Sequence, residues 1–463
     1  MEKISNWFSK SENIIQNLNG IKRRKVNSFL ITSILKRTSK HLQNIRSITD
    51  RNNIFKTQIA IASLFKNNKY VYFNGNIFFD CFAPKWPGES FYRLYEYLLK
   101  NLLNGEHFVP FIPYLVLSIT KRCVYRCEHC YAIHTLGNKD VLSLEKILGT
   151  VKDFQKMGVG VIAWEGGEPL LRFKELLILI EKTHNQSEAW LATTGYGITT
   201  EKAKKLKEAG LTAAIISLDH YDPDKHNEFR GNKKAFNMAI NAVRIFRENG
   251  ILPCIAICAT REIVSTGGLY RYLELAKEIG VGFIQVIDAM PSGRYLGENV
   301  ILTKAQLNEI RKFQIKVNTD PKYREYPGIS ARAYFEDDDH FGCSACNGMC
   351  YIDSSGNVQP CVFLQISFGN IMEERVQDIY KRMKSYFPHF LRGRCPAQAY
   401  HKIFAKKYEK TKILPQPYKN CMEVLEIIRK RGFPKTLQEI RNKYKIKGDL
   451  LEIPPKCRTE LEN

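Results

Sequence analysis

The sequence predicts an α/β fold whose core is a partial parallel (β/α)6 barrel over residues 111–295. Six short apolar runs alternate there with five segments that carry apolar residues at helical spacing. The runs are continuously apolar, as expected for parallel strands that are buried on both faces of a sheet. The six runs are YLVLSI (114–119), GVIAW (160–164), AWLATT (189–194), AAIISLD (213–219), CIAICAT (254–260) and GFIQVID (282–288).

The segments between these runs have the features of helices. Four of the five end in Gly or just before it, as helix C-termini often do. They are SLEKILGTVKDFQKMG (143–158), RFKELLILIEKT (172–183), TEKAKKLKEAG (200–210), AFNMAINAVRIFRENG (235–250) and LYRYLELAKEIG (269–280). Consecutive βα units of this kind predict that the functional site lies at the carboxyl ends of the strands.

Polar residues and glycines do follow the predicted strands. Three cysteines follow the first strand, EGGEP follows the second, and the fourth ends with Ser217 and Asp219. The sixth ends at Asp288, which is followed by AMPSGR. We therefore expect one site, assembled at this edge of the sheet from several loops.

The regions outside the barrel differ from it in composition. Residues 1–110 are expected to be helical and basic at first, then to form a strand pair, a Pro-rich turn and a helix, with a role in substrate recognition. Residues 296–340 read as a linker helix and an acidic loop, and residues 341–395 as a Cys-rich and Gly-rich domain. Residues 396–463 read as a basic helical extension.

The net charge of +23 favours anionic partners, such as nucleic acid or an anionic membrane surface, although an ordinary basic surface would explain it equally well. No RNA-binding module with interleaved aromatic residues is recognisable. The start of the chain lacks the pattern of a signal peptide, and no run approaches the ~18 apolar residues of a spanning helix. These features predict a cytoplasmic protein and leave peripheral membrane contact open.

The thirteen cysteines indicate metal binding or catalysis rather than a disulfide framework. Cys123, Cys127 and Cys130 lie in one short loop after the first strand. Structural zinc sites and closed iron–sulfur sites take four protein ligands. Three thiols therefore suggest a cluster with one iron left open to a ligand that is not protein, with a zinc loop or three unconnected thiols as the alternative.

The C-x3-C-x2-C spacing after a first barrel strand resembles the radical S-adenosylmethionine (radical SAM) superfamily. The resemblance implies that the three cysteines hold a 4Fe–4S cluster, whose open iron binds S-adenosylmethionine. It also implies reductive cleavage of this cosubstrate to a 5′-deoxyadenosyl radical that abstracts hydrogen from a substrate. His129, in the slot before the third cysteine, would lie near the adenine.

GGEP after the second strand resembles the motif of this family that contacts the methionine amino group. It comprises Gly166, Gly167, Glu168 and Pro169. Glycines let the backbone approach a ligand closely, and a carboxylate accepts hydrogen bonds from an ammonium group. We therefore expect these residues to bind the cosubstrate.

Three further positions resemble cosubstrate-binding stretches of the family. Thr194 stands where the family's TNG stretch has Asn, which is a departure from the family pattern. Ser217 and Asp219 resemble the SxD end of the fourth strand, which faces the ribose or the carboxylate. Arg230 is expected to pair with the methionine carboxylate, or alternatively to form a salt bridge at the start of a helix.

The second cysteine group resembles the SPASM domain that follows the barrel in many radical SAM enzymes. Cys343 (or Cys346), Gly356 and Cys361 fit its pattern, and IDSSGNVQPC resembles the hairpin that presents its last cysteine. The usual downstream cysteine run is absent, so one auxiliary 4Fe–4S cluster is expected, with a zinc knuckle as the alternative. The candidate ligands are Cys343, Cys346, Cys350 and Cys361, with Cys395 as the alternative fourth. Ordinary thiols are expected at Cys81, Cys254, Cys258, Cys421 and Cys457.

The resemblance implies an enzyme that modifies a ribosomal peptide or protein, or a small metabolite, and that takes electrons from a donor such as flavodoxin or ferredoxin. Asp288 is the candidate catalytic proton acceptor, with a hydrogen-bonded loop Asp as the alternative reading. His220 and Tyr196, at the ends of other strands, are secondary candidates for an acid–base role. Two other functions stay open: an iron–sulfur electron-transfer module without radical chemistry, and a radical SAM enzyme that acts on lipid or nucleic acid.

Overall fold

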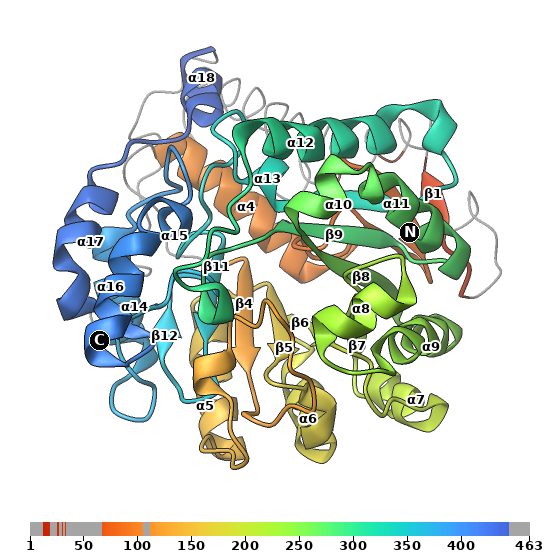
Figure 1. Cartoon of the computed structure of the whole chain (residues 1–463), viewed down its shortest axis with the longest axis horizontal. Coiled ribbons are helices and arrows are strands. Elements are labelled where there is room, and N and C mark those ends of the chain that lie inside the picture. Colours follow the sequence, from red (N-terminus) through yellow and green to blue (C-terminus); the bar gives the residue numbers. More distant parts are fainter. Residues whose placement is uncertain are drawn as a thin grey trace.

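The computed structural model describes residues 13–18, 26, 30, 33, 67–104 and 112–443. Its centre is a nine-stranded sheet with the order β10-β9-β8-β7-β6-β5-β4-β11-β12 (Figure 1). The strands from β4 to β9 run parallel. The outermost strands are β10 and β12, which do not pair with each other, so the barrel is open and partial.

All six strands predicted from the apolar runs are present, as are the five helices predicted between them. The strands are β4 (Tyr114–Ser118), β5 (Val161–Glu165), β6 (Glu188–Thr193), β7 (Leu211–Ser217), β8 (Leu252–Ala259) and β9 (Phe283–Asp288). The helices are α5 (Leu144–Lys156), α6 (Phe173–Thr183), α7 (Thr200–Glu208), α8 (Pro223–Arg230), α9 (Ala235–Glu248), α10 (Arg261–Ser265) and α11 (Gly268–Ile279). Two of these helices, α8 and α10, lie in the same region but are additional to the five predicted ones. The predicted α/β fold with a parallel core is thus confirmed.

Two parallel strands that the sequence did not reveal extend the core. β10 (Gly328–Ala331) follows helix α12 (Lys304–Thr319) and pairs with β9. β11 (Met349–Ile352) pairs with β4 from the other side and forms the expected hairpin with β12 (Val358–Gln359), whose turn contains Gly356 at φ +90°. The Cys-rich region is therefore joined to the barrel through the sheet itself.

A small antiparallel sheet packs inside the barrel near the amino ends of its strands. It consists of β1 (Gln16–Leu18), β2 (Tyr70–Phe73) and β3 (Asn76–Phe78). Phe78 meets Trp190 edge-on at 6.4 Å, and both side chains are buried. Helix α4 (Glu89–Asn104) follows after a Pro-containing turn, as predicted.

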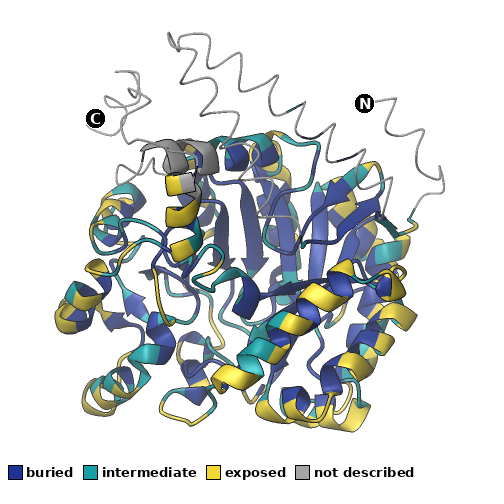
Figure 2. Cartoon of the chain, turned by 90° about the horizontal axis from the view of Figure 1, so that it is seen from above, coloured by how far each residue is buried: buried dark blue, intermediate teal, exposed yellow. Residues whose placement is uncertain are grey.

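Two apolar layers hold the barrel together. The outer layer joins one face of each strand to the surrounding helices, with Trp164 on the sheet and Phe154 and Phe246 on helices all fully buried. The inner layer joins the other face to β2 and β3. Figure 2 shows buried strands and helices that are buried only toward the sheet.

The remaining elements cover the Cys-rich region. They are α13 (Arg332–Phe335), β13 (Ile366–Ser367), α14 (Val376–Tyr386), α15 (Pro396–Ala399), α16 (His401–Thr411), β14 (Gln416–Pro417), α17 (Met422–Arg429) and α18 (Lys435–Lys443). The predicted basic helical region before residue 67 falls almost wholly outside the described residues, and residues 444–463 with Cys457 fall outside them entirely.

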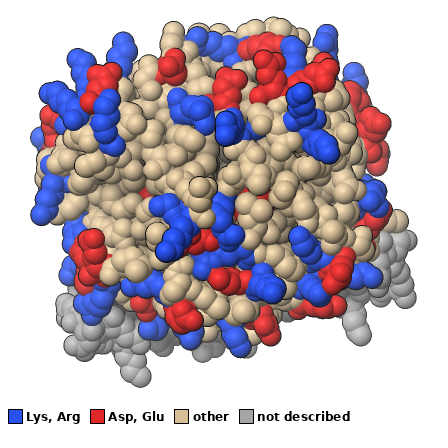
Figure 3. Space-filling view, turned by 60° about the horizontal axis from the view of Figure 1, so that its bottom comes forward, with Lys and Arg blue, Asp and Glu red and all other residues tan. Residues whose placement is uncertain are grey.

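The charged surface is mixed. On the face shown in Figure 3, Lys and Arg side chains are interspersed with Asp and Glu. Among the described helices, none combines the length and the apolar character needed to cross a membrane.

Candidate functional site

A cavity of about 390 Å³ lies at the carboxyl ends of the barrel strands and contacts both cysteine groups. Cys123, Cys127 and Cys130 line it from the loop after β4. Cys343 and Cys361 line it from the Cys-rich region. The other cysteines of the cavity wall are Cys258 and Cys395. The structure thus brings the two cysteine groups, more than 200 residues apart in the sequence, to one space.

The loop with the first three cysteines is fastened at its start by a carboxylate. Asp140 accepts hydrogen bonds from Thr120 Oγ1 at 2.7 Å, Lys121 N at 2.8 Å and Arg122 Nε at 3.0 Å. A carboxylate with several donors is a strong anchor because each of these bonds is charge-assisted. The loop is therefore set before any cofactor binds.

Gly166 and Gly167 lie directly against this loop. A Cβ on Gly167 would come within 2.2 Å of the carbonyl oxygen of Arg122 and 2.9 Å of Cβ of Cys123. Gly167 N donates to the Thr120 carbonyl at 2.8 Å, and this hydrogen bond joins the loop after β5 to the loop after β4. These glycines line the cavity as expected, and the close approach that requires them is to the cysteine loop itself.

The opposite side of the cysteine loop is closed by the segment after β9. A Cβ on Gly293, whose φ is +59°, would come within 2.3 Å of the carbonyl oxygen of Cys130. Arg294 donates from its backbone N to Cys130 O at 3.0 Å and from Nε to Cys127 O at 3.1 Å. AMPSGR, which follows the sixth predicted strand, therefore also holds the cysteine loop, through contacts with residues far away in the sequence.

Burial shapes the chemistry of the three thiols. It raises the pKa of Cys123 to about 12 and that of Cys130 to about 11. Thiolates at such positions need positive charge beside them, which a bound iron cluster supplies. Arg230 Nη1 already donates to Sγ of Cys127 at 3.6 Å. The donor set fits an iron–sulfur cluster, whose irons supply the positive charge.

Glu168 is placed differently from what the motif implied. It is fully buried, and its carboxylate accepts from Thr193 Oγ1 at 2.7 Å, Thr194 N at 2.8 Å, Thr194 Oγ1 at 2.6 Å and Leu170 N at 3.0 Å. Neither Glu168 nor Pro169 lines the cavity, whereas Thr193 and Thr194 do. Glu168 thus ties the end of β5 to the end of β6, and burial raises the pKa of its carboxyl group.

His129 and Ser217 line the cavity. The His129 ring stacks on Phe229 at 4.7 Å, and its buried Nδ1 has no hydrogen-bond partner among the described residues. Burial lowers the pKa of His129 to about 4, so the ring is neutral. An unpartnered buried nitrogen next to the cysteine loop fits a ligand that can hydrogen bond there.

Asp219 and Arg230 both line the cavity and form a buried ion pair through Arg230 Nε. Asp219 also accepts from the backbone N of Cys258 at 2.9 Å. Interaction with Arg230 holds the pKa of Asp219 below its usual range despite burial. Arg230 thus forms a salt bridge, as the alternative reading had it, but it is the last residue of α8 and does not start a helix. The same guanidinium contacts the cysteine loop.

Asp288 is also held in an ion pair. Arg332 Nε donates to Asp288 Oδ1 at 2.8 Å, and Gln398 Nε2 donates to Oδ2 at 2.8 Å. The Asp288 side chain is 0% exposed, although the residue is among those that line the cavity. Both oxygens are engaged, and this geometry favours the hydrogen-bonded reading of Asp288 over the proton acceptor. Tyr196 and His220 do not line the cavity.

The cysteines of the second group fall into two sets. Cys343, Cys361 and Cys395 line the cavity, whereas Cys346 and Cys350 are fully buried behind it. A hydrogen bond between the thiols of Cys343 and Cys395 raises the pKa of Cys343 and lowers that of Cys395. Within the described part of the chain, no three Cys, His, Asp or Glu side chains converge closely enough to hold a single metal ion.

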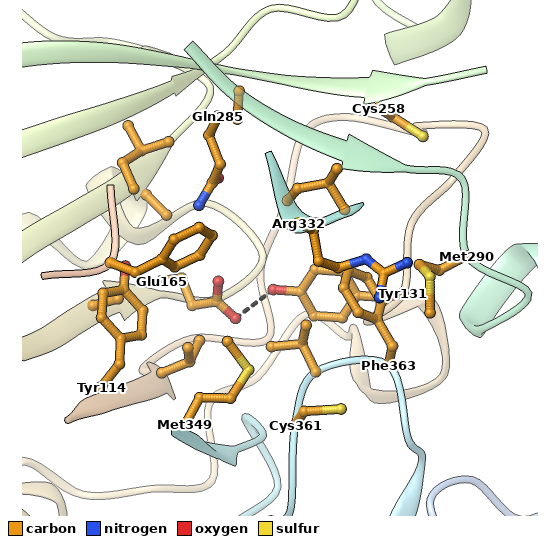
Figure 4. Close-up of a pocket in the computed structure, with 18 of the residues that line it drawn as sticks. Tyr114, Tyr131, Glu165, Cys258, Gln285, Met290, Arg332, Met349, Cys361 and Phe363 are labelled. Atoms are coloured by element: carbon orange, nitrogen blue, oxygen red, sulfur yellow. Dashed lines mark hydrogen bonds between the residues drawn. The ribbon is translucent and has the colours of Figure 1, made fainter. Parts of the chain in front are cut away.

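Glu165, Tyr131 and Gln285 are cavity residues that sequence reasoning missed (Figure 4). Tyr131 donates its phenolic hydrogen to Glu165 Oε1. Burial raises the pKa of Glu165 to about 7, which the hydrogen bonds from Tyr131 and Ser118 counteract. The available signal was a carboxylate directly before the two glycines, in a strand that is otherwise apolar.

Two domains of the chain match known families. Residues 117–267 match the profile of the radical SAM superfamily, and residues 343–400 match that of the SPASM iron–sulfur cluster-binding domain. An AdoMet-dependent heme synthase of Oleidesulfovibrio alaskensis is 26% identical over 322 residues, which cover 64% of this chain and 82% of that protein. A GTP 3′,8-cyclase of Alkaliphilus oremlandii is 28% identical over 273 residues, which cover 54% of this chain and 81% of that protein.

A solved structure supports the same assignment at the level of the fold. SuiB from Streptococcus suis superimposes with a TM-score of 0.51 and 18% identity, covering 68% of this chain and 80% of that chain. The matched domains contain the cysteine loop and the second cysteine group, respectively. The chain belongs to the radical SAM superfamily with a C-terminal SPASM domain, and it is an enzyme that uses S-adenosylmethionine, a 4Fe–4S cluster and auxiliary iron–sulfur chemistry.

Proposed function

We propose that this enzyme abstracts a hydrogen atom from a substrate group that lies in the cavity between the two cysteine groups. The observation that carries the proposal is the shared space: one cavity of about 390 Å³ is lined by Cys123, Cys127 and Cys130 and also by Cys343 and Cys361. A substrate group held there contacts the radical source on one side and an electron acceptor on the other.

Cys123, Cys127 and Cys130 would hold the 4Fe–4S cluster with the open iron. When bound, this cluster and S-adenosylmethionine supply the radical that starts the reaction. His129 and Ser217 bind the cosubstrate, and Gly166 and Gly167, which line the same cavity, let it approach the main chain closely. Glu168 acts through Thr194, which it holds at the cavity wall, so it is a positioning residue.

Arg230 serves both the cysteine loop and the cosubstrate site. Its ion pair with Asp219 fixes the guanidinium beside Cys127 and at the cavity wall. In that position Arg230 balances the negative charge of a bound cluster and can still offer an N–H group to the carboxylate of the cosubstrate.

One auxiliary cluster is proposed for the SPASM domain, held by Cys343, Cys361 and Cys395 together with Cys346 or Cys350. The first three are the members that face the cavity, and Cys395 lies in hydrogen-bond contact with Cys343. We therefore favour a ligand set that includes Cys395 over the set of four cysteines drawn only from residues 343–361. A flavodoxin or ferredoxin would supply the electrons.

The size of the cavity favours a peptide or protein substrate that inserts one side chain. About 390 Å³ is near the lower end for small-molecule sites, and this space also has to accommodate the cosubstrate. Phe82, Ala83 and Leu94 bring the N-terminal region to the cavity wall, which supports its role in substrate recognition. The names of the relatives, a heme synthase and a GTP cyclase, favour the second candidate, a small metabolite.

The test is S-adenosylmethionine cleavage by the reconstituted enzyme. Dithionite-reduced wild type should release 5′-deoxyadenosine, and a variant with Ala at Cys123, Cys127 and Cys130 should release none. A variant with Ala at the buried Cys421, which lies outside the cavity, is the matched control and should behave as wild type. Absence of release from the wild type would refute the proposal.

A further inference from the structure

Glu165 differs from the other carboxylates that line the cavity. The other four have both oxygens engaged: Asp80, Asp219, Asp288 and Glu336 accept from cations, hydroxyls, amides or backbone N–H groups. Glu165 Oε1 accepts from Tyr131 and, at 3.4 Å, from Ser118. Its Oε2 accepts no hydrogen bond from any described residue, and Glu165 retains accessible surface.

Tyr131 fixes the orientation of this carboxylate. The partly buried Tyr131 ring makes edge-on contacts with Tyr351 and Phe363, at centroid distances of 5.9 Å to each. Ser118 Oγ, which donates to Glu165, lies 3.1 Å from the hydroxyl of Tyr351. Tyr131 and Ser118 therefore hold Oε1, with Tyr351 in contact with Ser118, and this leaves Oε2 available to the cavity.

A second polar group faces the same space. Gln285 on β9 is 7% exposed, lines the cavity and makes no side-chain hydrogen bond within the described part of the chain. Figure 4 shows its amide directed toward the cavity, across from Glu165. An amide that lies on the cavity wall and has no partner among the described residues can hydrogen bond to a bound molecule. Apolar side chains such as Tyr114, Met349 and Phe363 form the walls between them.

We infer that Glu165 and Gln285 bind the reacting group of the substrate, and that Glu165 accepts its proton. This inference rests on the proposed function and names its substrate class: an uncharged, largely apolar or aromatic group that carries a hydroxyl, thiol or amide N–H. That group donates to Glu165 Oε2 and accepts from the Gln285 amide. In the transfer, the O–H, S–H or N–H bond breaks, its electron pair stays on the substrate, and the proton bonds to Oε2.

The local electrostatics suit this role. Burial raises the pKa of Glu165 to about 7, so the carboxyl group can take up and release a proton near neutral pH. No cation pairs with Glu165 among the described residues, whereas Asp219 and Asp288 are each held by an arginine. A substrate that has lost this proton is also a better electron donor to an auxiliary cluster, since its electron density is higher.

The test uses p-cresol, an aromatic molecule with one hydroxyl group, and toluene, which has the same shape without it. Binding to the reconstituted enzyme is measured at pH 8, where Glu165 is ionised. We expect Glu165→Gln to weaken p-cresol binding about tenfold, as for loss of a hydrogen bond to a charged acceptor, and to leave toluene binding within about twofold. Gln285→Leu should weaken p-cresol binding in the same selective way.

Glu188→Gln is the matched control. Glu188 is also a buried carboxyl group whose pKa burial raises to about 7, but it lies outside the cavity and accepts from Lys85 N and Trp190 Nε1. This variant should keep the p-cresol preference of the wild type. Equal p-cresol affinity in the wild type and Glu165→Gln, or no p-cresol binding by the wild type, would overturn the inference. If Glu165→Gln does not fold, Gln285→Leu decides by the same criterion.

The binding test does not depend on radical chemistry. Release of 5′-deoxyadenosine by the same wild-type sample tests the proposed function separately. Normal release without selective p-cresol binding refutes only the role of Glu165 and Gln285, and selective binding without release refutes only the proposed function.

Discussion

Thr194 donates two hydrogen bonds to Glu168, from its backbone N at 2.8 Å and from Oγ1 at 2.6 Å. The pair joins the GGEP loop after β5 to the end of β6, and Thr194 faces the cavity while Glu168 does not. A threonine in place of the family's asparagine thus retains a side-chain donor at this position. This chain's departure from the family pattern is accommodated by the contact between Thr194 and Glu168, which motif spacing alone does not reveal.

Thr194→Val is expected to destabilise the fold by about 2 kcal/mol, because a buried carboxylate loses a charge-assisted donor. The measurement is the free energy of unfolding in urea. Thr183→Val is the matched control, since its buried hydroxyl donates to the neutral carbonyl of Leu179 at 2.6 Å, and it should cost about 1 kcal/mol. Equal losses in the two variants would contradict the special role of the Glu168 contact.

Gly167→Ala is expected to prevent assembly of the first cluster. The added Cβ would collide with backbone atoms of Arg122, one 2.2 Å away, and with Cβ of Cys123, so the cysteine loop must shift. Iron content and absorbance per chain measure the loss after reconstitution. Gly149→Ala is the control: this glycine lies inside α5 with nothing within 4 Å of its Cβ position, and the change should stabilise the chain by about 0.5–1 kcal/mol.

Asp288→Asn is expected to act mainly on stability. It leaves Arg332 with a weaker partner in a buried position, where breaking an ion pair typically costs about 3–5 kcal/mol. A double-mutant cycle with Arg332→Met should show a coupling energy of at least about 1 kcal/mol in urea unfolding. If Asp288→Asn instead retains full stability and loses only substrate turnover, Asp288 is the proton acceptor after all.

The stability of the enzyme should depend on pH through Glu165. Burial raises the pKa of its carboxyl group from 4.5 to about 7, so between these values the folded state binds a proton that the unfolded state has released. Stability therefore falls as the pH rises through this window, by on the order of 2 kcal/mol. The groups that face Glu165 are Tyr131, Ser118 and Tyr351.

Urea unfolding of wild type and Glu165→Gln at pH 5 and pH 8 measures this effect. The variant should lose less stability between the two values than the wild type does, because its amide does not titrate. Tyr131→Phe removes a donor to the ionised carboxylate, so it should steepen the fall. The same pH dependence in Glu165→Gln as in the wild type would show that Glu165 is not the group responsible.

The sequence reveals the strands of the core because each one is a continuous apolar run of five to eight residues. It does not reveal β10 and β11, which are four residues long and polar or Cys-containing, because their strand character comes from pairing with β9 and β4. Short segments of this kind have little local preference, and tertiary contacts decide their conformation.

The same distinction applies to the site. Motif spacing placed Cys123, Gly167 and Ser217 at the cavity, because each directly follows or ends a core strand. It could not show that the oxygens of Glu168 and Asp288 are taken by Thr194 and Arg332, which belong to other elements. Gln285 and Glu165 escaped notice because isolated polar residues in a strand carry no motif, and only the curvature of the sheet turns them toward each other.

The most direct test of two distinct clusters, with the open iron at the loop after β4, is electron paramagnetic resonance of the dithionite-reduced, reconstituted enzyme. The wild type should show signals from both clusters, and S-adenosylmethionine should change only one of them. The variant with Ala at Cys123, Cys127 and Cys130 should keep the other signal, unchanged by S-adenosylmethionine. A signal in that variant that still responds to S-adenosylmethionine would contradict the assignment of the open iron to the loop after β4.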